Sequence, residues 1–337
     1  MQGLGPIGLG TAKLIMDDPD LDLCGAVDTY RYAGSHLGDI FGIGHGHYIV
    51  DSIDKVVLGS DSKVLVLATK SMLADIEEDI TKAIGRGMHV VSPAEELFYP
   101  EHANKDFKER VDKLAEKKGV CVIGRGVNPG VLMDTYPMYV IRDYLLDKEM
   151  KLGDIKSIEI CRTDDTIERR SSLLAKTGAG ISDASFFDEM ARSGKIGHIG
   201  LEMSATYIVH NLGIQYQNIG FLRVPVHAQH GVKPKNGSFI EERGISGISE
   251  QCEVFSVKGF PHLLLKLEMS VGAKSRNYVH ITMLDGEEYM KDYSSIVNGD
   301  IATCRILHYL ARNITTYGIA GLNRWNPPIL PGRLLSS

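Results

Sequence analysis

Two spacings of apolar residues alternate through the first part of the chain: short continuous runs, and residues three or four positions apart. Short runs rich in β-branched residues predict strands at 21–28, 63–69, 89–92 and 120–123. Apolar residues three or four positions apart predict helices at 72–85 and 102–118. Strands that alternate with helices of this length are typical of a parallel sheet with helices on both faces. We therefore expect the chain to begin with an α/β domain.

The pattern changes near residue 150, where longer strands of alternating polar and apolar residues begin. Strands are predicted at 154–163, 219–228, 251–257, 262–269 and 278–284, and helices at 183–193, 201–212 and 299–316. This order predicts an antiparallel or mixed sheet covered on one face by helices. The predicted organisation is a first domain over 1–135, a second α+β domain over 136–325 and an extended, proline-rich tail over 326–337.

Composition narrows the classes of protein that the chain can represent. Of the 337 residues 24% are charged, and the net charge of −6 provides no basic field to attract nucleic acid. No apolar run reaches the ~18 residues of a membrane span, and no signal peptide is recognisable. The five cysteines are dispersed without a CxxC pair, which fits a reducing compartment. We expect a cytoplasmic protein with neither nucleic-acid nor membrane partners.

A glycine motif near the start of the chain predicts a dinucleotide site. The GxGxxG pattern includes the expected cofactor-binding residues Gly3, Gly5, Pro6, Ile7 and Gly8. Its first glycine permits a tight turn, its second lets a pyrophosphate approach the backbone, and its third lets helix and strand pack closely. Asp28, 20 residues beyond Gly8 at the end of the next predicted strand, stands where a carboxylate binds an adenosine ribose hydroxyl. Together they predict a Rossmann-type, doubly wound parallel sheet.

Arg31 leaves the choice between NAD and NADP open. A cation three positions after Asp28 can meet a 2′-phosphate, whereas the carboxylate favours a free 2′-hydroxyl. A role for Arg31 as a solvated loop residue is about equally plausible. The expected cofactor is therefore NAD or NADP.

The strand that normally leads into such a glycine motif is represented by Met1 and Gln2 alone. That strand is usually central in the sheet and buried on both faces. Either several residues are missing before Met1 or the first strand is a stub, and the first alternative is preferred. On that interpretation, a few β-branched residues added in front of Met1 should raise stability and cofactor affinity.

Small polar residues follow the strand predicted at 63–69. Ala68, Thr69 and Ser71 are expected at the carboxyl edge of the sheet, where ligands bind in open α/β folds. Thr69 and Ser71 are placed to line the nicotinamide-ribose channel. Ser71 is equally suited to cap the helix that follows, and the two roles are compatible.

Two adjacent carboxylates, Glu95 and Glu96, follow the strand predicted at 89–92. A carboxylate beside the nicotinamide has a raised pKa if it is partly desolvated, which suits proton transfer. Glutamates are also common in the first turn of a helix, where they only complement its dipole. The preferred interpretation is that one of the two glutamates is solvated and the other takes part in chemistry.

A glycine-rich turn over 124–130 follows the strand predicted at 120–123 and carries Asn128 and Pro129. The Asn128 amide can hydrogen-bond a cofactor carboxamide, or a substrate amine or carbonyl. Asn-Pro-Gly is also well suited to a tight turn without any ligand. Asn128 and Pro129 are therefore expected near the cofactor, with Asn128 also facing the substrate.

The histidines offer one candidate substrate-binding residue. His198 lies in a loop between two predicted helices, although an isolated histidine more often has a structural role. The pairs His45 with His47 and His227 with His230 have no third acidic or cysteine ligand nearby in sequence. No metal site is expected.

Eight segments occur in the order and spacing of one group of oxidoreductases. They are GLGPIG at 3–8, AVD at 26–28, ATKS at 68–71, SPAEELFYP at 92–100, GRGVNPG at 124–130, TGAG at 177–180, GHIGLEMS at 197–204 and NGDIAT at 298–303. With these motifs the chain resembles the NAD(P)H-dependent amine dehydrogenases related to 2,4-diaminopentanoate dehydrogenase, a branch of the dihydrodipicolinate reductase-like Rossmann proteins. The resemblance covers nearly the whole chain.

The resemblance implies a Rossmann domain, a C-terminal α/β substrate and dimerisation domain, and a homodimer. It implies reversible oxidative deamination of an amine, or reductive amination of a carbonyl compound with ammonia. It also implies a catalytic glutamate in the EEL segment, at Glu95 with Glu96 as the alternative. Lys70 and Met203 depart from the family pattern, which leaves cofactor affinity and substrate scope open.

Two alternatives remain beside this assignment. Dihydrodipicolinate reductases, which reduce an imine or enamine, carry an Asp-Ala-Pro-Ser-Gly-Thr-type loop that this sequence lacks. A non-catalytic dinucleotide-binding sensor is the alternative from another class. Sugar and inositol dehydrogenases are disfavoured, because they place Glu-Lys-Pro where this chain has Ala94-Glu95-Glu96 and so lacks the lysine for a hydroxyl substrate.

Overall fold

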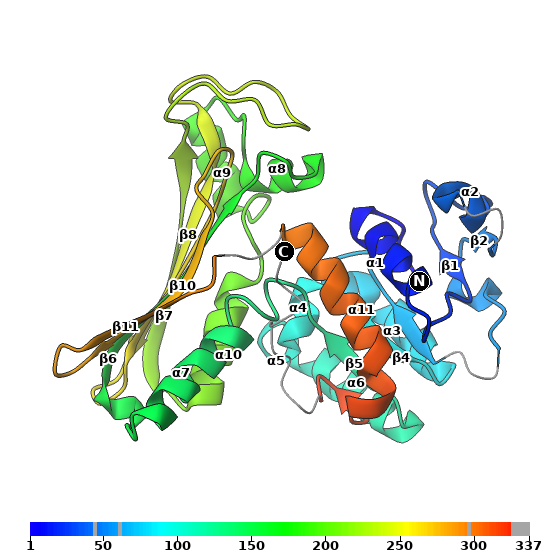
Figure 1. Cartoon of the computed structure of the whole chain (residues 1–337), viewed down its shortest axis with the longest axis horizontal. Coiled ribbons are helices and arrows are strands. Elements are labelled where there is room, and N and C mark those ends of the chain that lie inside the picture. Colours follow the sequence, from blue (N-terminus) through cyan, green and yellow to red (C-terminus); the bar gives the residue numbers. More distant parts are fainter. Residues whose placement is uncertain (43–45, 60–62, 295–297, 325–337) are drawn as a thin grey trace. The chain divides into compact units, whose positions relative to one another are not determined.

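The computed structural model describes residues 1–42, 46–59, 63–294 and 298–324 (Figure 1). The chain forms two compact units, one made of Met1–Val131 with Ser295–Ser337 and the other of Leu132–Ser294. We call them unit 1 and unit 2. The tail predicted at 326–337 and His45 lie outside the described residues.

Unit 1 is built on a parallel sheet. Its strands are β1 (Ala26–Val27), β2 (Ile49–Val50), β3 (Val64–Val66), β4 (His89–Ser92), β5 (Cys121–Gly124) and β12 (Gly321–Leu322). Four of them pair in the order β12-β5-β4-β3, and β1 pairs with β2. All of these pairings are parallel, as the alternation of strands and helices predicted.

Met1 and Gln2 join the two groups of strands. Gln2 bridges Val27 of β1 and Leu67 just beyond β3, both in parallel. The Gln2 N–H donates to the Val66 carbonyl at 2.8 Å, and the Val27 N–H donates to the Met1 carbonyl at 2.9 Å. The strand order therefore runs outward in both directions from this two-residue stub, which is the doubly wound Rossmann arrangement. The predicted fold class of this part of the chain is confirmed.

Helices cover both faces of this sheet. They are α1 (Pro6–Met16), α3 (Leu73–Gly85), α6 (Lys105–Lys118) and α11 (Gly299–Tyr317), with shorter turns at α2 (Leu37–Phe41), η1 (Ile53–Lys55), α4 (Glu95–Phe98) and α5 (Pro100–Ala103). Helices α3 and α6 bury their apolar stripes against the sheet in one core. Helices α1 and α11 lie side by side and cover the other face (Figure 1).

The position of α11 corrects the predicted domain boundary. The sequence placed residues up to 325 in the second domain, but α11 packs on α1, β3 and β4 and belongs to unit 1. The buried side chains of Ala302, Ile306, Leu310 and Ile314 form the apolar stripe that makes this contact. An apolar stripe shows that a helix is covered but does not identify its partner, so periodicity alone could not assign α11.

A groove of about 510 Å³ lies beside Met1 in unit 1. Residues 21–25 and Val64 line it, and the Met1 amine donates to the Gly25 carbonyl at 3.0 Å. Burial lowers the pKa of this amine to about 6, because the charged form is poorly solvated there. The groove is thus lined by Met1, whose buried amine loses its charge more readily than an exposed one.

We expect a short N-terminal extension to stabilise the protein. Three or four β-branched residues in front of Met1 would convert the buried amine into an amide and pair with β1 and β3. The midpoint of thermal unfolding should rise by several degrees, about the effect of 1 kcal/mol or more. An extension of the same length made of glycine and serine is the control, and equal midpoints for both would contradict the expectation.

Unit 2 contains a mixed six-stranded sheet. Its strands are β6 (Ile155–Asp165), β7 (Tyr216–His227), β8 (Ile245–Ser256), β9 (His262–Ser270), β10 (Arg276–Met283) and β11 (Glu288–Asp292). They pair in the order β11-β10-β6-β9-β8-β7, and every pairing is antiparallel except that of β6 with β9. The helices are α7 (Thr135–Asp147), α8 (Ser171–Thr177), α9 (Ala184–Arg192) and α10 (Leu201–Leu212), with a 3-10 turn η2 (Leu152–Asp154). The predicted mixed sheet with helices is confirmed.

The two faces of this sheet differ. Buried apolar residues alternate along β6, β8, β9 and β10 on the face that α7, α8, α9 and α10 contact. The side chains between them are half-buried and largely polar. This alternation is typical of a sheet with only one face packed against helices.

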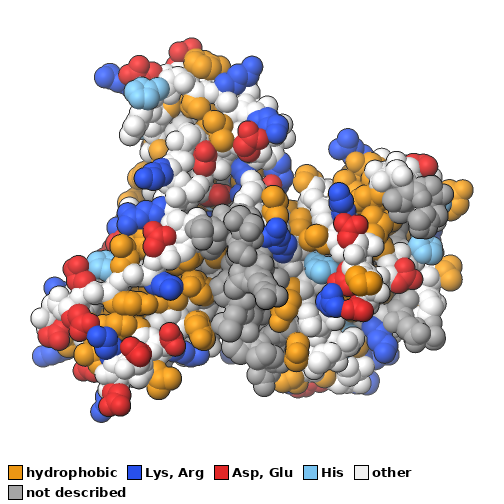
Figure 2. Space-filling view, in the orientation of Figure 1, with side chains coloured by type: hydrophobic (Ala, Val, Ile, Leu, Met, Phe, Trp, Pro, Cys, Tyr) orange, Lys and Arg blue, Asp and Glu red, His pale blue; other side chains and the backbone are white. Residues whose placement is uncertain are grey.

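Two further surface properties bear on the partners. In the part of the chain that the structure describes, no helix is long and apolar enough to cross a membrane. On the face shown in Figure 2, lysine and arginine side chains lie among aspartates and glutamates. That face presents no continuous basic surface.

Candidate active site

The carboxyl ends of the strands in unit 1 bring the predicted cofactor residues together. Gly3 follows the stub strand, Asp28 follows β1, Ala68 lies just beyond β3, Glu95 follows β4 and Asn128 follows β5. Because the strands are parallel, these segments share one edge of the sheet. This is the edge at which ligands bind in open α/β folds.

The three glycines of the motif meet different surroundings. Gly3 has φ +85°, and a Cβ there would lie 2.8 Å from the Ala68 carbonyl carbon. A Cβ on Gly8 would run into the Gly3 carbonyl oxygen. Around Gly5 nothing lies within 4 Å of a built Cβ. The first and third glycines are therefore required by packing, and only the second opens to a ligand.

Helix α1 begins directly beside that opening. Gly5 is its N-cap and has no side chain with which to cap it, and Pro6 occupies the first turn. The N–H groups of the first turn, at Ile7 and Gly8, therefore need an acceptor from elsewhere. A pyrophosphate at this helix N-terminus would satisfy them and be favoured by the helix dipole.

Asp28 locks the loops on both sides of the opening. Its Oδ2 accepts the Leu4 N–H at 2.9 Å, and its Oδ1 accepts the N–H groups of Tyr30, Arg31 and Tyr32 at 3.0, 2.9 and 3.4 Å. Partial burial would raise the pKa of Asp28, but these four bonds outweigh it and hold the pKa below its usual value. Asp28 is thus ionised and holds the glycine loop, a role that the sequence did not reveal.

Arg31 is exposed beside this carboxylate. Its guanidinium carbon lies 5.2 Å from the centre of the Tyr32 ring. A planar cation stacked on an aromatic ring can adjoin an adenine or a 2′-phosphate. The geometry agrees with both NAD and NADP.

The segment after β3 corrects one prediction. Thr69 packs against Gly3, since its Cγ2 is 2.9 Å from a Cβ built there. Ser71, however, does not cap helix α3: the N-cap is Met72, which supplies no side-chain bond. The Glu96 carboxylate instead accepts the Leu73 N–H at 2.7 Å. Glu96 takes this role because it reaches the helix N-terminus from the next loop, where its charge also complements the dipole.

The hydrogen bond between Glu96 and the Leu73 N–H distinguishes the two candidate glutamates. Glu96 is bonded to the start of α3, and its own N–H donates to the Ser71 carbonyl at 3.2 Å. Glu95, half-buried, is the preceding residue of the same short helix α4. The structure therefore gives Glu96 a structural role at the start of α3.

Helix α4 is fixed in position from several sides. The Ser92 hydroxyl accepts the Ala94 N–H at 3.2 Å. The Asn323 side chain donates to the carbonyls of Leu97 and Phe98 at 2.7 and 3.0 Å and accepts the Gly124 N–H at 2.8 Å. Asn323 was missed by the sequence analysis, and its only signal was an Asn in a glycine-rich segment after the last helix. It holds the backbone that carries Glu95.

The turn after β5 has a defined shape. The peptide bond between Asn128 and Pro129 is cis, and the Gly126 N–H donates to the Pro129 carbonyl at 3.1 Å. The buried Arg125 guanidinium lies 4.7 Å from the centre of the Phe98 ring. Asn128 is half-buried at the same sheet edge as α4. The turn is therefore held by contacts within the protein, and it also places Asn128 where it can contact a cofactor.

His198 belongs to unit 2 and is not among these residues. Its Nδ1 accepts the Gly200 N–H at 2.9 Å, so the neutral ring carries its proton on Nε2. Its own N–H donates to the buried Glu250 carboxylate at 2.7 Å, and Arg223 donates to both Glu250 and the His198 carbonyl, at 2.6 and 3.1 Å. The loop is thus held rigidly by a buried ion pair.

Unit 2 also contains a buried cationic group that the sequence analysis did not identify. Arg162 of β6 is 6% exposed, and its Nη1 has no hydrogen-bond partner in the described structure. Its other terminal nitrogen is 3.6 Å from Asp164, which also accepts Arg169 at 2.8 Å. Asn277, paired with Arg162 across β10 and β6, has an unbonded Oδ1 in that same buried region. Two guanidiniums thus approach the same carboxylate in this buried region.

The chain is similar to known proteins in sequence and in fold. No protein-family model matches the chain. The 2,4-diaminopentanoate dehydrogenase of Acetoanaerobium sticklandii is 24% identical over 216 residues, which make up 63% of this chain and 59% of that protein. The match thus spans less than two thirds of the relative.

Solved structures share the fold over more of the chain. An amine dehydrogenase from Mycobacterium smegmatis superposes with a TM-score of 0.80 at 18% identity, covering 98% of this chain and 96% of the other. GenD2 from gentamicin A biosynthesis, solved with NAD, gives a TM-score of 0.52 at 14% identity over 86% and 70% of the two chains. The chain therefore shares the two-domain fold of these dehydrogenase structures.

The carboxyl edge of the parallel sheet in unit 1 fits a dinucleotide. The open Gly5, the uncapped first turn of α1 and the ionised Asp28 together match a pyrophosphate and an adenosine ribose. NAD and NADP both meet these requirements. Among the described residues no cluster of three His, Cys, Asp or Glu side chains could hold a metal ion.

Proposed function

We propose that the protein is an NAD(P)-dependent dehydrogenase that acts on a carbon–nitrogen bond, deaminating an amine oxidatively and aminating a carbonyl compound in reverse. The single observation that carries this is the placement of Glu95, which follows β4 at the same sheet edge as the glycine motif and Asp28. When bound, the nicotinamide supplies the hydride acceptor or donor. The named relatives supply the substrate class.

Glu95 is proposed to handle the protons of nitrogen. An ammonium group must lose a proton before its carbon can lose a hydride, and Glu95 accepts that proton. Once it has released that proton to solvent, the regenerated carboxylate takes a proton from the water that attacks the imine, and in reverse the same transfers run in the opposite order. Asn323 and Ser92 act as positioning residues, since they hold α4 and touch no reacting atom.

The substrate class is proposed from the matched relative. That protein is named for 2,4-diaminopentanoate, an amine that also carries a carboxylate. An amino acid with a second amine, rather than a simple aliphatic amine, is the substrate class that this favours.

A matrix of cofactors and substrates tests the function as a whole. We expect NADH or NADPH oxidation, followed at 340 nm, when a keto acid and excess ammonia are present together. Reduced nicotinamide absorbs at about 340 nm and the oxidised form does not, so the loss of absorbance follows hydride transfer. Turnover without ammonia would indicate reduction of a carbonyl group or a preformed imine. Tight NADH binding without hydride transfer to any substrate would favour the dinucleotide-binding sensor.

The open face of the unit 2 sheet is proposed to form a homodimer. On β7 the side chains of Leu222 and Val224 are 53% and 37% exposed, and Phe255 of β8 is 42% exposed nearby. Large apolar residues on an uncovered sheet face mark an interaction surface. Leu222→Asp should convert a dimer to a monomer in light scattering, whereas Leu146→Asp on helix α7 should not. An unchanged mass for Leu222→Asp would contradict this surface.

A further inference from the structure

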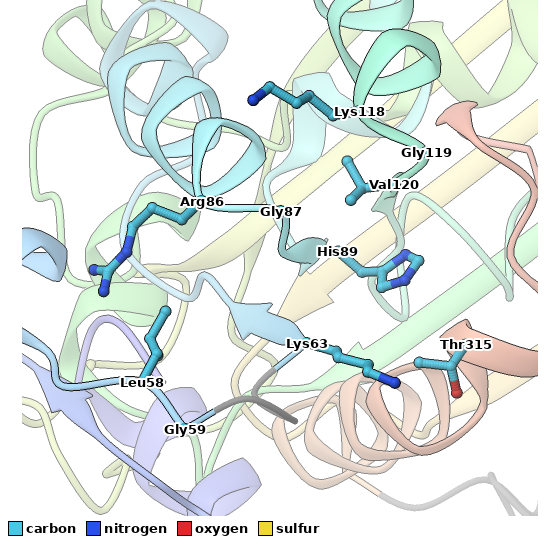
Figure 3. Close-up of a pocket in the computed structure, with 10 residues that line it drawn as sticks. All are labelled: Leu58, Gly59, Lys63, Arg86, Gly87, His89, Lys118, Gly119, Val120 and Thr315. Carbon is cyan, nitrogen blue, oxygen red and sulfur yellow. The ribbon is translucent and has the colours of Figure 1, made fainter.

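A second pocket of unit 1 lies at the opposite edge of the sheet from the cofactor residues. It has a volume of about 490 Å³ and surrounds the first residues of three neighbouring strands, β3, β4 and β5 (Figure 3). The C-terminal ends of α3, α6 and α11 close it on the other sides. Parallel topology puts the amino ends of the strands here and the dinucleotide motif at the far edge.

The side chains that line this pocket are cationic. Lys63, Arg86, His89 and Lys118 contribute to its wall, and neither Asp nor Glu is among the described residues that line it. Lys63 and Thr315 extend toward one another, and the His89 ring lies close by (Figure 3). A wall of this kind attracts anions, because each of these groups can donate a hydrogen bond.

Two of the cations have a structural explanation. Arg86 donates to the carbonyls of Ile53 and Val56, the second at 2.8 Å. Lys118 lies 3.5 Å from the Gly85 carbonyl at the end of α3, where positive charge complements the helix dipole. These two supply positive potential but are already bonded to backbone oxygens.

Lys63 is different, because its ammonium makes no hydrogen bond or ion pair with the described part of the chain. Only its backbone is engaged, through the bond that its carbonyl accepts from the His89 N–H at 2.6 Å. Its exposed side chain is held at the pocket entrance by the start of β3. Lys63 is therefore available to a ligand.

His89 presents a donor to the same space. The Cys121 N–H donates to its Nδ1 at 2.9 Å, so the ring is neutral and its proton is on Nε2. Burial, with a smaller contribution from Lys63, lowers the pKa of His89 and keeps it in this form. The pocket thus combines an ammonium, an imidazole N–H and the Thr315 hydroxyl as donors.

We propose that this pocket binds the phosphate group of a small molecule, with Lys63, His89 and Thr315 as its direct ligands and Arg86 and Lys118 as the surrounding positive charge. The tetrahedral oxygens of a phosphate accept bonds from several directions, as these three donors require. The site is separate from the dinucleotide edge and does not depend on the proposed dehydrogenase activity. Its ligand is either inorganic phosphate or a phosphate monoester.

Calorimetric titration of the protein saturated with NADH tests this site, because NADH fills the dinucleotide edge. Inorganic phosphate and ribose 5-phosphate are titrated separately, and the tighter of the two identifies the source of the phosphate. The titrations are repeated without NADH, so that failure of dinucleotide binding does not affect the outcome. We expect saturable binding at millimolar or lower concentration.

Matched lysine variants decide whether the pocket is responsible. Lys63→Met should raise the dissociation constant about tenfold or more, since it removes a charged hydrogen-bond donor. Thr315→Val should raise it severalfold, and it tests the site with minimal change in shape. Lys117→Met removes the same charge from an exposed position on α6 outside the pocket, and it should change the constant less than about twofold.

Three results would overturn the proposal. The first is the absence of any binding of either phosphate compound to the wild-type protein. The second is an equal loss in Lys63→Met and Lys117→Met, which would indicate diffuse surface charge. The third is binding of a single-stranded oligonucleotide without binding of either small phosphate compound.

Discussion

Replacing Glu95 by Gln is expected to lower kcat by about 10²- to 10⁴-fold, the usual contribution of a general acid or base. The amide keeps the size and hydrogen-bonding shape of the side chain but can neither accept the ammonium proton nor activate water. The loss should be seen in both directions of the reaction. Steady-state rates of NADH formation and consumption measure it, with NADH affinity from fluorescence as the check that the cofactor site is intact.

The adjacent Glu96 provides the control for this prediction. Its bond to the Leu73 N–H is structural, so Glu96→Ala should cost about 1 kcal/mol of stability through the loss of a helix cap. The midpoint of thermal unfolding should fall by a few degrees. Glu96→Gln retains an oxygen acceptor and should keep kcat within about threefold, because a neutral acceptor still caps a helix. A large loss in Glu96→Gln together with an active Glu95→Gln would reverse the assignment.

Replacing Gly5 by Ala is expected to weaken NADH binding without weakening the fold. Gly5 has φ −69°, a conformation that alanine adopts readily, and a built Cβ meets nothing within 4 Å. That open space is where the pyrophosphate approaches, so an added methyl group should raise the dissociation constant about 10- to 100-fold, as overpacking by 1–3 kcal/mol does. Fluorescence titration with NADH measures the affinity, and the unfolding midpoint should stay the same.

Gly8→Ala separates this effect from a packing effect. Its Cβ would collide with the Gly3 carbonyl oxygen, so the loop would have to move. We expect a large fall in the unfolding midpoint together with lost NADH binding. Gly5→Ala should therefore differ from Gly8→Ala in stability, and similar destabilisation by both would show that the ligand does not occupy the space above Gly5.

Local periodicity predicted much of the fold. The apolar spacing over 72–85 corresponds to α3 at Leu73–Gly85, and the run at 89–92 corresponds to β4 at His89–Ser92. Both signals lie within one element, where side-chain burial follows the period of the backbone. The glycine motif was also informative, because Gly3 and Gly8 are required by contacts with the segment after β3 and within the motif, whereas Gly5 leaves open space.

Contacts between distant residues were beyond such reasoning. The bond from Leu73 to Glu96 spans 23 positions, and the bond from Gly124 to Asn323 spans 199. The identity of a glutamate or an asparagine does not indicate a partner that is distant in sequence. The sequence therefore could not assign different roles to Glu95 and Glu96 or single out Asn323. Arg162 was overlooked for a related reason: an arginine in a strand of alternating residues reads as exposed until its face of the sheet is known.

The placement of α11 and β12 has a consequence for how the protein is made. Unit 1 takes its first strands from the beginning of the chain and its last strand and Asn323 from the other end, with all of unit 2 synthesised in between. During translation, α4 and β5 are synthesised before their partners in β12 and Asn323. At ~5–20 residues per second, those partners emerge roughly ten seconds or more later. During that interval the edge of β5 that later pairs with β12 is unpaired and prone to aggregation. We expect chaperone binding to matter most at this stage.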